Sequence, residues 1–316
     1  MIRLNYPEDF AHDRHIKDRC VLALGFFDGV HMAHRKLIER AISIAEEKGL
    51  TPAVFTFPSE NERVKSSAKR IYSTEQKLSI LESLGVKLCY VVDFGSVASL
   101  TPDGFIEKIL IEKFGAEAVV CGYNFRFGKG ASADAAYLKN ALSALGRECE
   151  IIEEYTLDGN PLSSTYIRDL LSSADMRGAA RALGMPYFIE GEVTRGDGRG
   201  RSLGIPTANL TLPNGRELLK RGVYASCVYL DGVRYPSITN VGACPTFGER
   251  ETHSETLILQ QVGNIYGKKI RVYLLDFIRE EKLFDSKDEL IMQINVDINH
   301  ANAVYTETIW QEIGLN

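Results

Sequence analysis

In the first half of the chain, short apolar runs alternate with segments in which apolar residues recur every three or four positions. The first pattern is typical of buried strands and the second of amphipathic helices. The predicted strands are Cys20–Phe27, Ala53–Phe57, Leu88–Phe94, Ala118–Gly122 and Glu148–Ile152. Because strands and helices alternate, we expect an α/β domain with a doubly wound parallel sheet covered on both faces.

The predicted helices of this half have recognisable ends. Gly49 ends a helix with one apolar stripe, which consists of Leu37, Ile38, Ala41, Ile42 and Ala45. Ser73 and Gln76 match a capping box, and Thr101 caps a helix with Pro102 in its first turn. The expected helices are Met32–Lys48, Ser73 to about Gly85, the segment after Thr101 with Phe105, Ile106, Ile109 and Leu110 on one face, Ala135–Leu145, Tyr166–Leu171 and Met176–Leu183.

After Gly184 the pattern changes, because strand-like segments follow one another with only turn residues between them. These segments are Phe188–Val193, Val223–Leu230, Ser237–Val241, Thr256–Gln260 and Ile270–Phe277. They predict an antiparallel barrel or sandwich, followed by a helix that starts at Asp285 and a last helix toward Trp310. We therefore expect two domains, residues 1–184 and 185–316.

Composition and charge narrow the class of protein. A length of 316 residues suits two domains, and no run of about 18 apolar residues predicts a membrane span. The N-terminus lacks a hydrophobic signal core, and the six scattered cysteines form no C-x-x-C pair. We therefore expect a cytoplasmic protein without disulfides or structural zinc. The net charge of −5 argues against a nucleic-acid partner, so that bound phosphates must be held by local donors.

The segment from Leu24 to His34 joins the end of a strand, a turn and a helix start. Ligands of open α/β sheets bind at the carboxyl ends of strands, where a helix N-terminus offers N–H groups to phosphate. His31 and His34 can donate to one α-phosphate, on which negative charge grows during nucleotidyl transfer. The alternatives are two partly exposed histidines without a ligand, and a zinc site, for which H-x-x-H lacks the usual glutamate.

Two later segments add donors for phosphate. The loop Cys121–Gly130 combines glycines with basic and aromatic residues, although its spacing is not that of a Walker loop. The run Ser163–Thr165 stands at a helix start, with Arg168 one turn later. Such hydroxyls can cap the helix, bind triphosphate oxygens, or do both, and Arg168 favours phosphate binding.

Glycines and arginines alternate in Gly191–Leu210, the segment of the chain with the strongest pattern. Such a loop is rich in backbone N–H donors and positive charge, and it ends in an extended stretch. There Thr207 and Asn209 point to the same side and offer the hard oxygen ligands that Mg²⁺ prefers. No G-x-G-x-x-G spacing occurs, which excludes a dinucleotide-binding fingerprint. A glycine-rich hairpin without a ligand is the alternative.

Together these segments resemble the bacterial bifunctional riboflavin kinase/FMN adenylyltransferases, also called FAD synthetases. The H-x-G-H and S-S-T-x-x-R motifs of nucleotidylyltransferases match at His31, His34, Ser164, Thr165 and Arg168, and Gly122–Gly128 matches G-x-[DN]-F-R-F-G. The riboflavin kinase signature G-x-V-x-x-G-x-x-x-G-R-x-L-G-[FI]-P-T-A-N is complete from Gly191 to Asn209. Further matches are Gly222–Ala225, Thr239–Gly242, Pro245–Phe247, Ser254–Thr256, Tyr266-Gly267 and Ile278–Phe284.

The resemblance implies that the N-terminal domain converts FMN and ATP into FAD and pyrophosphate, with Mg²⁺ present. His31, His34 and Arg168 are implied to engage ATP phosphates and to act in catalysis, and Asn124 is implied to lie near the nucleotide or flavin. The implied ATP-binding residues of this domain are Gly25, Phe26, His31, His34, Asn124, Ser164, Thr165 and Arg168.

The C-terminal domain is implied to convert riboflavin and ATP into FMN and ADP. A glutamate in a strand is most often a solvated surface residue. The resemblance instead makes Glu255 the base that takes the proton of the ribityl 5′-hydroxyl. Thr207 and Asn209 are implied to hold Mg²⁺. The implied phosphate-binding residues of this domain are Gly196, Gly200, Arg201, Gly204, Thr207 and Asn209.

Three positions depart from the family pattern. Ala33 replaces the glycine between the two histidines, and Thr56–Glu60 lacks the Asp-Pro-His-Pro-like run with its histidine. Leu257 stands where the family has a histidine after the catalytic glutamate. Two further readings therefore remain open: a riboflavin kinase with an inactive N-terminal domain, and a flavin-binding regulator without turnover.

Overall fold

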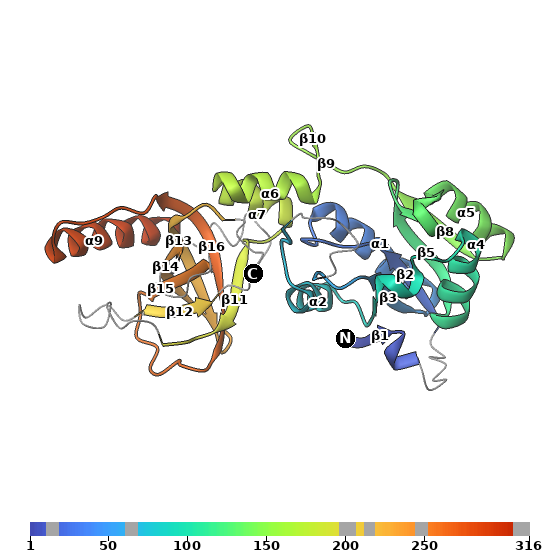
Figure 1. Cartoon of the computed structure of the whole chain (residues 1–316), viewed down its shortest axis with the longest axis horizontal. Coiled ribbons are helices and arrows are strands. Elements are labelled where there is room, and N and C mark those ends of the chain that lie inside the picture. Colours follow the sequence, from blue (N-terminus) through green and yellow to red (C-terminus); the bar gives the residue numbers. More distant parts are fainter. Residues whose placement is uncertain (11–18, 61–68, 196–206, 212–218, 244–251, 306–316) are drawn as a thin grey trace. The chain divides into compact units, whose positions relative to one another are not determined.

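The computed structural model describes residues 1–10, 19–60, 69–195, 207–211, 219–243 and 252–305 (Figure 1). The chain divides into two compact units, Met1–Ser164 and Thr165–Asn316. Among the described residues, none of the helices combines the length and the apolar character needed to cross a membrane.

The first unit contains the parallel sheet that the alternation of strands and helices predicts. Its strand order is β1-β4-β3-β2-β5-β8, and all neighbouring strands run parallel. The strands are β1 Ile2–Tyr6, β2 Cys20–Leu24, β3 Thr51–Thr56, β4 Leu88–Val92, β5 Ala116–Gly122 and β8 Glu148–Ile152. The sequence prediction missed β1, a short edge strand in which Arg3 and Asn5 alternate with apolar residues and no residue is fully buried.

Helices cover both faces of this sheet. Leu22 and Leu24 of β2 belong to one core with Phe105 and Leu138, whereas the alternating residue Ala23 points to the opposite face. Helix α1 contacts β2, β3 and β5 and contributes nothing to that core, so it covers the other face. The helices are α1 Met32–Lys48, α2 Thr74–Ser83, α3 Phe94–Val97, α4 Pro102–Gly104 and α5 Ala135–Ala144, with a π-helical segment at Phe105–Lys113.

The ends of two helices confirm the sequence prediction. α1 ends at Gly49, which has a left-handed backbone with φ 63°. The capping box of α2 is formed, because Gln76 N donates to Ser73 Oγ at 3.2 Å and Ser73 N donates to the Gln76 side chain at 3.1 Å. In the buried stripe of α1, however, Ile44 takes the place predicted for Ile42, because Ile44 lies nearer to the middle of the stripe.

The remaining elements of this unit are short. They are 3₁₀ helices at Glu8–Phe10 and Lys129–Ala131, a ribbon of β6 Arg126–Phe127 with β7 Ala133–Asp134, and a ribbon of β9 Thr156–Leu157 with β10 Asn160–Pro161.

The second unit contains an antiparallel six-stranded barrel with strand order β11-β16-β13-β14-β15-β12 (Figure 1). The strands are β11 Phe188–Glu192, β12 Thr207–Thr211, β13 Gly222–Leu230, β14 Val233–Ala243, β15 Thr252–Ile258 and β16 Lys269–Arg279. Thr194, just after β11, donates its N–H to Asn209 O at 2.9 Å. This bridge brings the two edge strands together and nearly closes the barrel.

Helices α6 Ser164–Ser173 and α7 Met176–Leu183 precede the barrel. An ion pair of 3.0 Å between Arg177 and Asp276 joins α7 to β16. α7 and the part of α6 after Ser164 belong to the compact barrel unit, and the compact units divide earlier in the chain than residues 184 and 185. The functional boundary at 184/185 stays a prediction.

The C-terminal helix α9 spans Lys287–Val304 and is capped by Ser286, whose hydroxyl accepts from Glu289 N at 3.2 Å. The prediction of a start at Asp285 was wrong by one residue, because the serine, three positions before Glu289, supplies the capping oxygen. One helix reaches Val304, and Trp310 lies outside the described residues.

Candidate active sites

The predicted nucleotide site of the first unit lies where the strand order of the parallel sheet reverses, between β2 and β5. β3, β4 and β1 lie on one side of β2, and β5 and β8 lie on the other. The segments Gly25–His34 and Gly122–Gly128 therefore leave the carboxyl ends of two neighbouring strands. Open α/β sheets bind their ligands at this switch point.

The turn after β2 has an unusual backbone. Phe27 and Val30 adopt φ of 54° and 43°, which side chains other than glycine rarely tolerate. Gly25 faces the ring of Phe27, and a Cβ there would lie 2.7 Å from a ring carbon. Asp28, in the middle of the turn, accepts two hydrogen bonds from distant segments. Ile71 N donates to Asp28 Oδ1 at 3.1 Å, and Ser164 Oγ donates to Asp28 O at 2.9 Å.

The two predicted histidines lie together at the start of α1. His31 is the N-cap of the helix and is 4% exposed. Its ring stacks on His34 with a centroid distance of 3.6 Å and an interplanar angle of 19°, and His34 meets the ring of Phe27 edge-on at 5.2 Å. No acidic residue occupies the first turn of α1, so the positive end of the helix dipole is open to an anion.

The other predicted residues of this site lie on three segments. Asn124 is exposed in the turn after β5, which Phe125 N closes by donating to Gly122 O at 3.0 Å. Ser164 is joined to the histidine-bearing turn by its bond to Asp28 O. Thr165 is exposed and Arg168 half-buried in α6, in the second unit. The first unit therefore brings together Gly25, Phe26, His31, His34 and Ser164.

The segment Thr56–Glu60, which lacks the family's histidine, is ordered against α2. Thr56 Oγ1 donates to Phe26 O at 2.9 Å. Glu60 accepts from Thr74 N at 3.1 Å and from the Thr74 hydroxyl. Burial acts to raise the pKa of Glu60, but the hydrogen bonds from Thr74 and the charge of Lys77 hold it below its ordinary value. This segment contains no histidine, and it holds the backbone of Phe26 in place through Thr56.

Sequence reasoning missed Lys77, which is completely buried beside this segment. A lysine in an amphipathic helix is normally assigned to the exposed face. The signal that was available is its position: Ile80 and Leu81, three and four residues later, are core residues of α2.

The predicted base of the second unit stands in the middle of a row of polar residues. β12 pairs with β15 so that Asn209 is opposite Glu255, and β15 pairs with β14 so that Glu255 is opposite Asn240. Residues directly opposite in antiparallel strands project from the same face. Asn209, Glu255 and Asn240 therefore lie side by side on one face, with Thr207 two residues along β12.

That face is the outside of the barrel. The alternating residues Ala208, Thr256 and Thr239 are buried, and the hydroxyls of Thr239 and Thr256 are 2.9 Å apart. Because side chains alternate along a strand, the buried hydroxyls inside place Glu255 and Asn209 outside. Glu255 is exposed, and Asn209 is half-buried.

A pocket of about 270 Å³ adjoins this row of residues. It is lined by Thr207, Asn240, Glu255 and Leu257 from the strands, by Glu281, Lys282 and Phe284 after β16, and by Leu290, Ile294 and Asp297 from α9. Asp297, which is 1% exposed, accepts three bonds from Arg279 at 3.0 Å, 3.1 Å and 2.8 Å. This buried ion pair fixes α9 as the wall of the pocket.

Asn240, which lines this pocket, is a second residue whose place at the site sequence reasoning missed. Its amide nitrogen donates to Glu281 Oε1 at 3.1 Å, which fixes the orientation of the amide. Its Oδ1 is buried and has no hydrogen-bond partner in the described part of the chain. Gly242 makes room for this arrangement, because a Cβ there would lie 2.5 Å from Glu281 Oε1. The free oxygen can accept from a ligand in the pocket.

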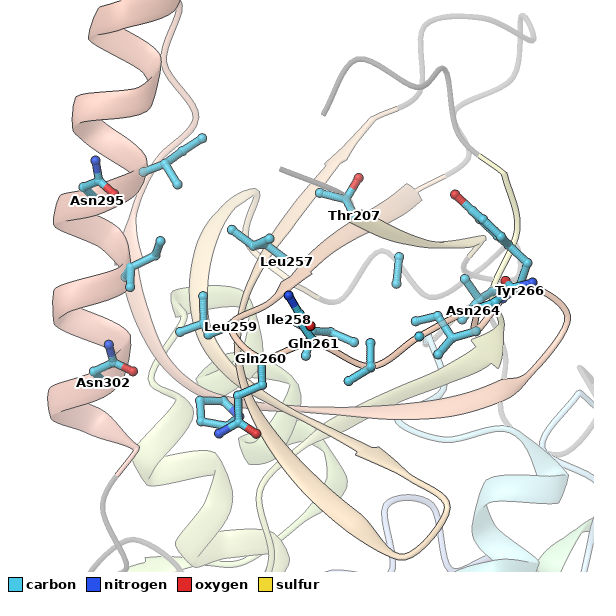
Figure 2. A pocket seen from close by; sticks show the side chains of 18 of the residues that line it. Thr207, Leu257, Ile258, Leu259, Gln260, Gln261, Asn264, Tyr266, Asn295 and Asn302 are labelled. Carbon is cyan, nitrogen blue, oxygen red and sulfur yellow. The ribbon is translucent and has the colours of Figure 1, made fainter. Parts of the chain in front are cut away.

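A larger cavity of about 970 Å³ also has Thr207 in its wall. Figure 2 shows its wall, formed by Thr207, Leu257 to Gln261, Asn264 and Tyr266 on the barrel, and by Asn295 and Asn302 on α9. Apolar walls with a few amides and one aromatic ring are typical of sites for small molecules. Thr207, Leu257 and Ile294 line both cavities, so the two adjoin one another.

The residues of β12 fit a magnesium ion by the chemistry of their donors. Asn209 Nδ2 donates to Thr207 O at 3.4 Å, which leaves the amide oxygen as the atom that can accept a cation. The Thr207 hydroxyl and the Asn209 amide are hard oxygen donors on one face, next to the Glu255 carboxylate. The other predicted phosphate contacts, Gly196, Gly200, Arg201 and Gly204, lie outside the described residues.

Together, a parallel sheet with a helix start at its switch point and a barrel with an acidic residue beside two adjoining cavities define a two-unit nucleotide-using enzyme. Comparison with known proteins specifies the family. The family model described as FAD synthetase matches residues 13–166, and the model described as riboflavin kinase matches residues 183–305.

Two relatives span nearly the whole chain. The bifunctional riboflavin kinase/FMN adenylyltransferase of Bacillus subtilis is 36% identical over 308 residues, which cover 95% of this chain and 96% of that protein. The protein of the same description from Escherichia coli is 33% identical and covers 89% and 91%. The chain therefore belongs to the family of bifunctional riboflavin kinase/FMN adenylyltransferases.

The fold has a solved counterpart. A crystal structure described as a macrolide-efflux protein from Streptococcus pneumoniae superposes with a TM-score of 0.84 at 29% identity and covers 96% of this chain and 99% of that one.

Proposed function

We propose that this chain carries out two consecutive ATP-dependent reactions. The barrel unit converts riboflavin and ATP into FMN and ADP, and the α/β unit converts FMN and ATP into FAD and pyrophosphate. Membership of the bifunctional family supports both steps. The observation that carries the proposal is the position of Glu255, between Asn209 and Asn240 on a face that adjoins two cavities.

In the barrel unit, the nucleotide occupies the larger cavity and riboflavin the smaller one. Thr207 lines both, so the γ-phosphate and the ribityl 5′-hydroxyl meet beside it. Glu255 takes the proton of this hydroxyl while its oxygen bonds to the γ-phosphorus and ADP leaves. Asn240 Oδ1 accepts a hydrogen bond from the flavin substrate. Mg²⁺, held by Thr207 and Asn209, neutralises phosphate charge when bound.

In the α/β unit, a phosphate oxygen of FMN attacks the α-phosphorus of ATP, and pyrophosphate leaves. His31 and His34 donate to the α-phosphate, where they stabilise the charge of the transition state. Ser164, Thr165 and Arg168 bind the phosphates at the start of α6. We assign the residues around Gly25, Phe26 and Asn124 to the binding of the nucleotide and flavin.

The remaining assignments follow from the two reactions. We propose that the partners are the small molecules riboflavin, FMN and ATP, with no nucleic acid and no membrane, and that the protein works in the cytoplasm.

A time course of flavin products tests the proposal. Riboflavin, ATP and Mg²⁺ are incubated with the protein, and the flavins are separated by chromatography; FMN should rise first and FAD after it. A second reaction starts from FMN, because Ala33 and Thr56–Glu60 depart from the family pattern. FMN that accumulates from riboflavin, together with the absence of FAD in both reactions, identifies a kinase with an inactive α/β unit and refutes the bifunctional assignment.

Glu255→Gln separates catalysis from flavin binding. This variant should lose riboflavin phosphorylation by roughly 10²–10⁴-fold, because the general base is removed, while flavin fluorescence still reports binding. An unchanged turnover would refute the assignment of the base, and a wild-type protein that binds riboflavin without turnover would identify a regulator.

A further inference from the structure

Lys77 is a buried cation with three defined acceptors at the edge of the adenylyltransferase site. Its side chain is 0% exposed. Nζ donates to Phe57 O at 2.6 Å, to Phe26 O at 3.1 Å and to Thr56 Oγ1 at 3.1 Å. Phe26 follows β2, and Thr56 and Phe57 stand at the end of β3. One ammonium group of α2 therefore joins the carboxyl ends of two sheet strands.

The carbonyl that Lys77 holds belongs to the peptide that opens the histidine-bearing turn. The next residue, Phe27, has φ 54°, and Val30 has φ 43°. Such backbone conformations persist only where surrounding groups determine them. Phe26 O accepts from both Lys77 and Thr56, so this end of the turn is fixed from two elements. The middle of the turn is fixed by the bonds to Asp28 described above.

The ring of Phe26 also lies next to two cations. Lys77 Nζ lies 4.9 Å from the ring centroid, and the guanidinium of Arg70 lies 4.8 Å from it. A cation over an aromatic face stabilises the position of the ring. Lys77 thus constrains both the backbone and the side chain of Phe26, one of the residues assigned above to nucleotide binding.

We propose that Lys77 is a positioning residue for adenylyl transfer: its ammonium fixes Phe26 and thereby the turn that brings His31 and His34 to the nucleotide. The proposal rests on the adenylyltransferase function assigned above. Lys77 acts through the turn, and its own contacts are with protein groups.

The charges around Lys77 make its role sensitive to pH. Burial lowers the pKa of Lys77 to about 8; the charge of Arg70 acts in the same direction, while Cys89, Asp28 and Glu60 act to raise it. A protonated lysine donates three hydrogen bonds, one to each acceptor, whereas a neutral amine has two N–H groups. As pH rises through about 8, one of the three attachments is therefore lost.

Lys77→Met tests the proposal, because it keeps the length of the side chain and removes the donors. FAD formation from FMN should fall roughly 10- to 100-fold, mainly in kcat, as expected for the loss of charge-assisted hydrogen bonds. Riboflavin phosphorylation by the same molecules is the internal control and should stay within about two-fold. Lys87→Met, at an exposed lysine, is the matched control and should leave both rates unchanged.

The pH profile needs no variant and separates positioning from a structural role. In the wild type, the ratio of FAD formation to riboflavin phosphorylation should fall as pH rises through about 8. The same ratio should be low and flat in Lys77→Met. Thr56→Val, which removes one acceptor of Lys77 and the second donor to Phe26 O with little change in shape, should lower FAD formation by a smaller factor. It covers the case in which Lys77→Met does not fold.

Three results would overturn the proposal: a wild-type ratio that does not change with pH, the same fall in Lys77→Met, or Lys77→Met and Thr56→Val with wild-type rates of FAD formation. In each of these the wild type still makes FAD, so the assigned function survives. A wild type that makes no FAD from FMN refutes the function and the role of Lys77 together.

Discussion

At the scale of single residues, each site contains a polar side chain that hydrogen bonds to neighbouring protein groups hold in one orientation. Asn240 shows this in the kinase pocket. Glu281 holds its amide nitrogen at 3.1 Å, and the buried oxygen on the other side of the amide is left for a ligand. Asn240 lines the smaller of the two cavities and not the larger one.

Asn240→Ala should raise the KM for riboflavin about ten-fold, the effect of one lost hydrogen bond of about 1–1.5 kcal/mol. The KM for ATP should change little, because Asn240 lines only the smaller of the two cavities. Steady-state kinetics with each substrate varied in turn measures both constants. Asn295→Ala, in the larger cavity, is the matched control, and a raised KM for ATP alone in Asn240→Ala would contradict the assignment.

The lowered pKa of Lys77 also predicts how the stability of the protein depends on pH. As pH rises through about 8, stability should increase while FAD formation decreases. Burial lowers this pKa from 10.5 to about 8, so between these values the unfolded chain binds more protons than the folded one. The contribution of Lys77 to the free energy of unfolding is therefore constant below pH 8 and rises above it, by about 3 kcal/mol in all. Urea unfolding of the wild type and Lys77→Met at several pH values should show the difference moving in favour of the wild type from pH 8 upward. A difference independent of pH would contradict the lowered pKa.

At the scale of elements, the attachment of α9 decides the shape of the kinase pocket. Much of this helix is exposed, including Met292 and Val296. Among the described residues of the helix, only Asp297, Ala301 and Val304 are buried. Asp297 is the strongest of these attachments, because Arg279 binds both its oxygens and Gln293 adds a further bond at 2.9 Å.

Asp297→Asn should lower the free energy of unfolding of the barrel unit by about 3–5 kcal/mol, because it leaves the charge of Arg279 partly buried without its counter-ion. The KM for riboflavin should rise as the wall of the pocket loosens. Asp231→Asn breaks the exposed pair with Lys268 at 2.6 Å and should cost less than about 1 kcal/mol. Urea unfolding measures both variants, and equal losses would show that burial does not strengthen the Arg279 pair.

At the scale of the whole molecule, the chain contains two compact units, and the histidines assigned to one chemical step lie in a different unit from the base assigned to the other. His31 and His34 lie in the α/β unit, whereas Thr207, Asn209 and Glu255 lie in the barrel unit. The chain joins a unit that makes FMN to a unit that consumes it.

The two steps should therefore fail separately. His34→Ala should stop FAD formation and leave FMN formation, because it removes a donor to the α-phosphate, and Glu255→Gln should do the reverse. A mixture of the two variants should restore the conversion of riboflavin to FAD, since FMN can diffuse from one molecule to another. Chromatography of the flavins distinguishes these cases, and the loss of both activities in either single variant would contradict the separation of the sites.

Local patterns along the chain were sufficient to predict most of the elements. The apolar stripe and Gly49 predicted α1 from Met32 to Lys48, and Ser73 with Gln76 predicted the start of α2. These signals depend on contacts between residues within a few positions of one another, which the sequence contains directly. The edge strand β1 and the one-residue shift at Ser286 escaped prediction, because the alternation of Ile2, Leu4 and Tyr6 with polar residues is only five residues long and the cap depends on which of two polar side chains supplies the oxygen.

The sequence by itself determined the order of the two folds, the family and the segments that carry the chemistry. Only the tertiary structure decided which side chains meet. Asn240 became a neighbour of Glu255 through the register of β14 and β15, and Lys77 became buried because β2, β3 and α2 converge on it. Strand register and the acceptors that a buried side chain meets depend on partners distant in the chain, which no local pattern encodes.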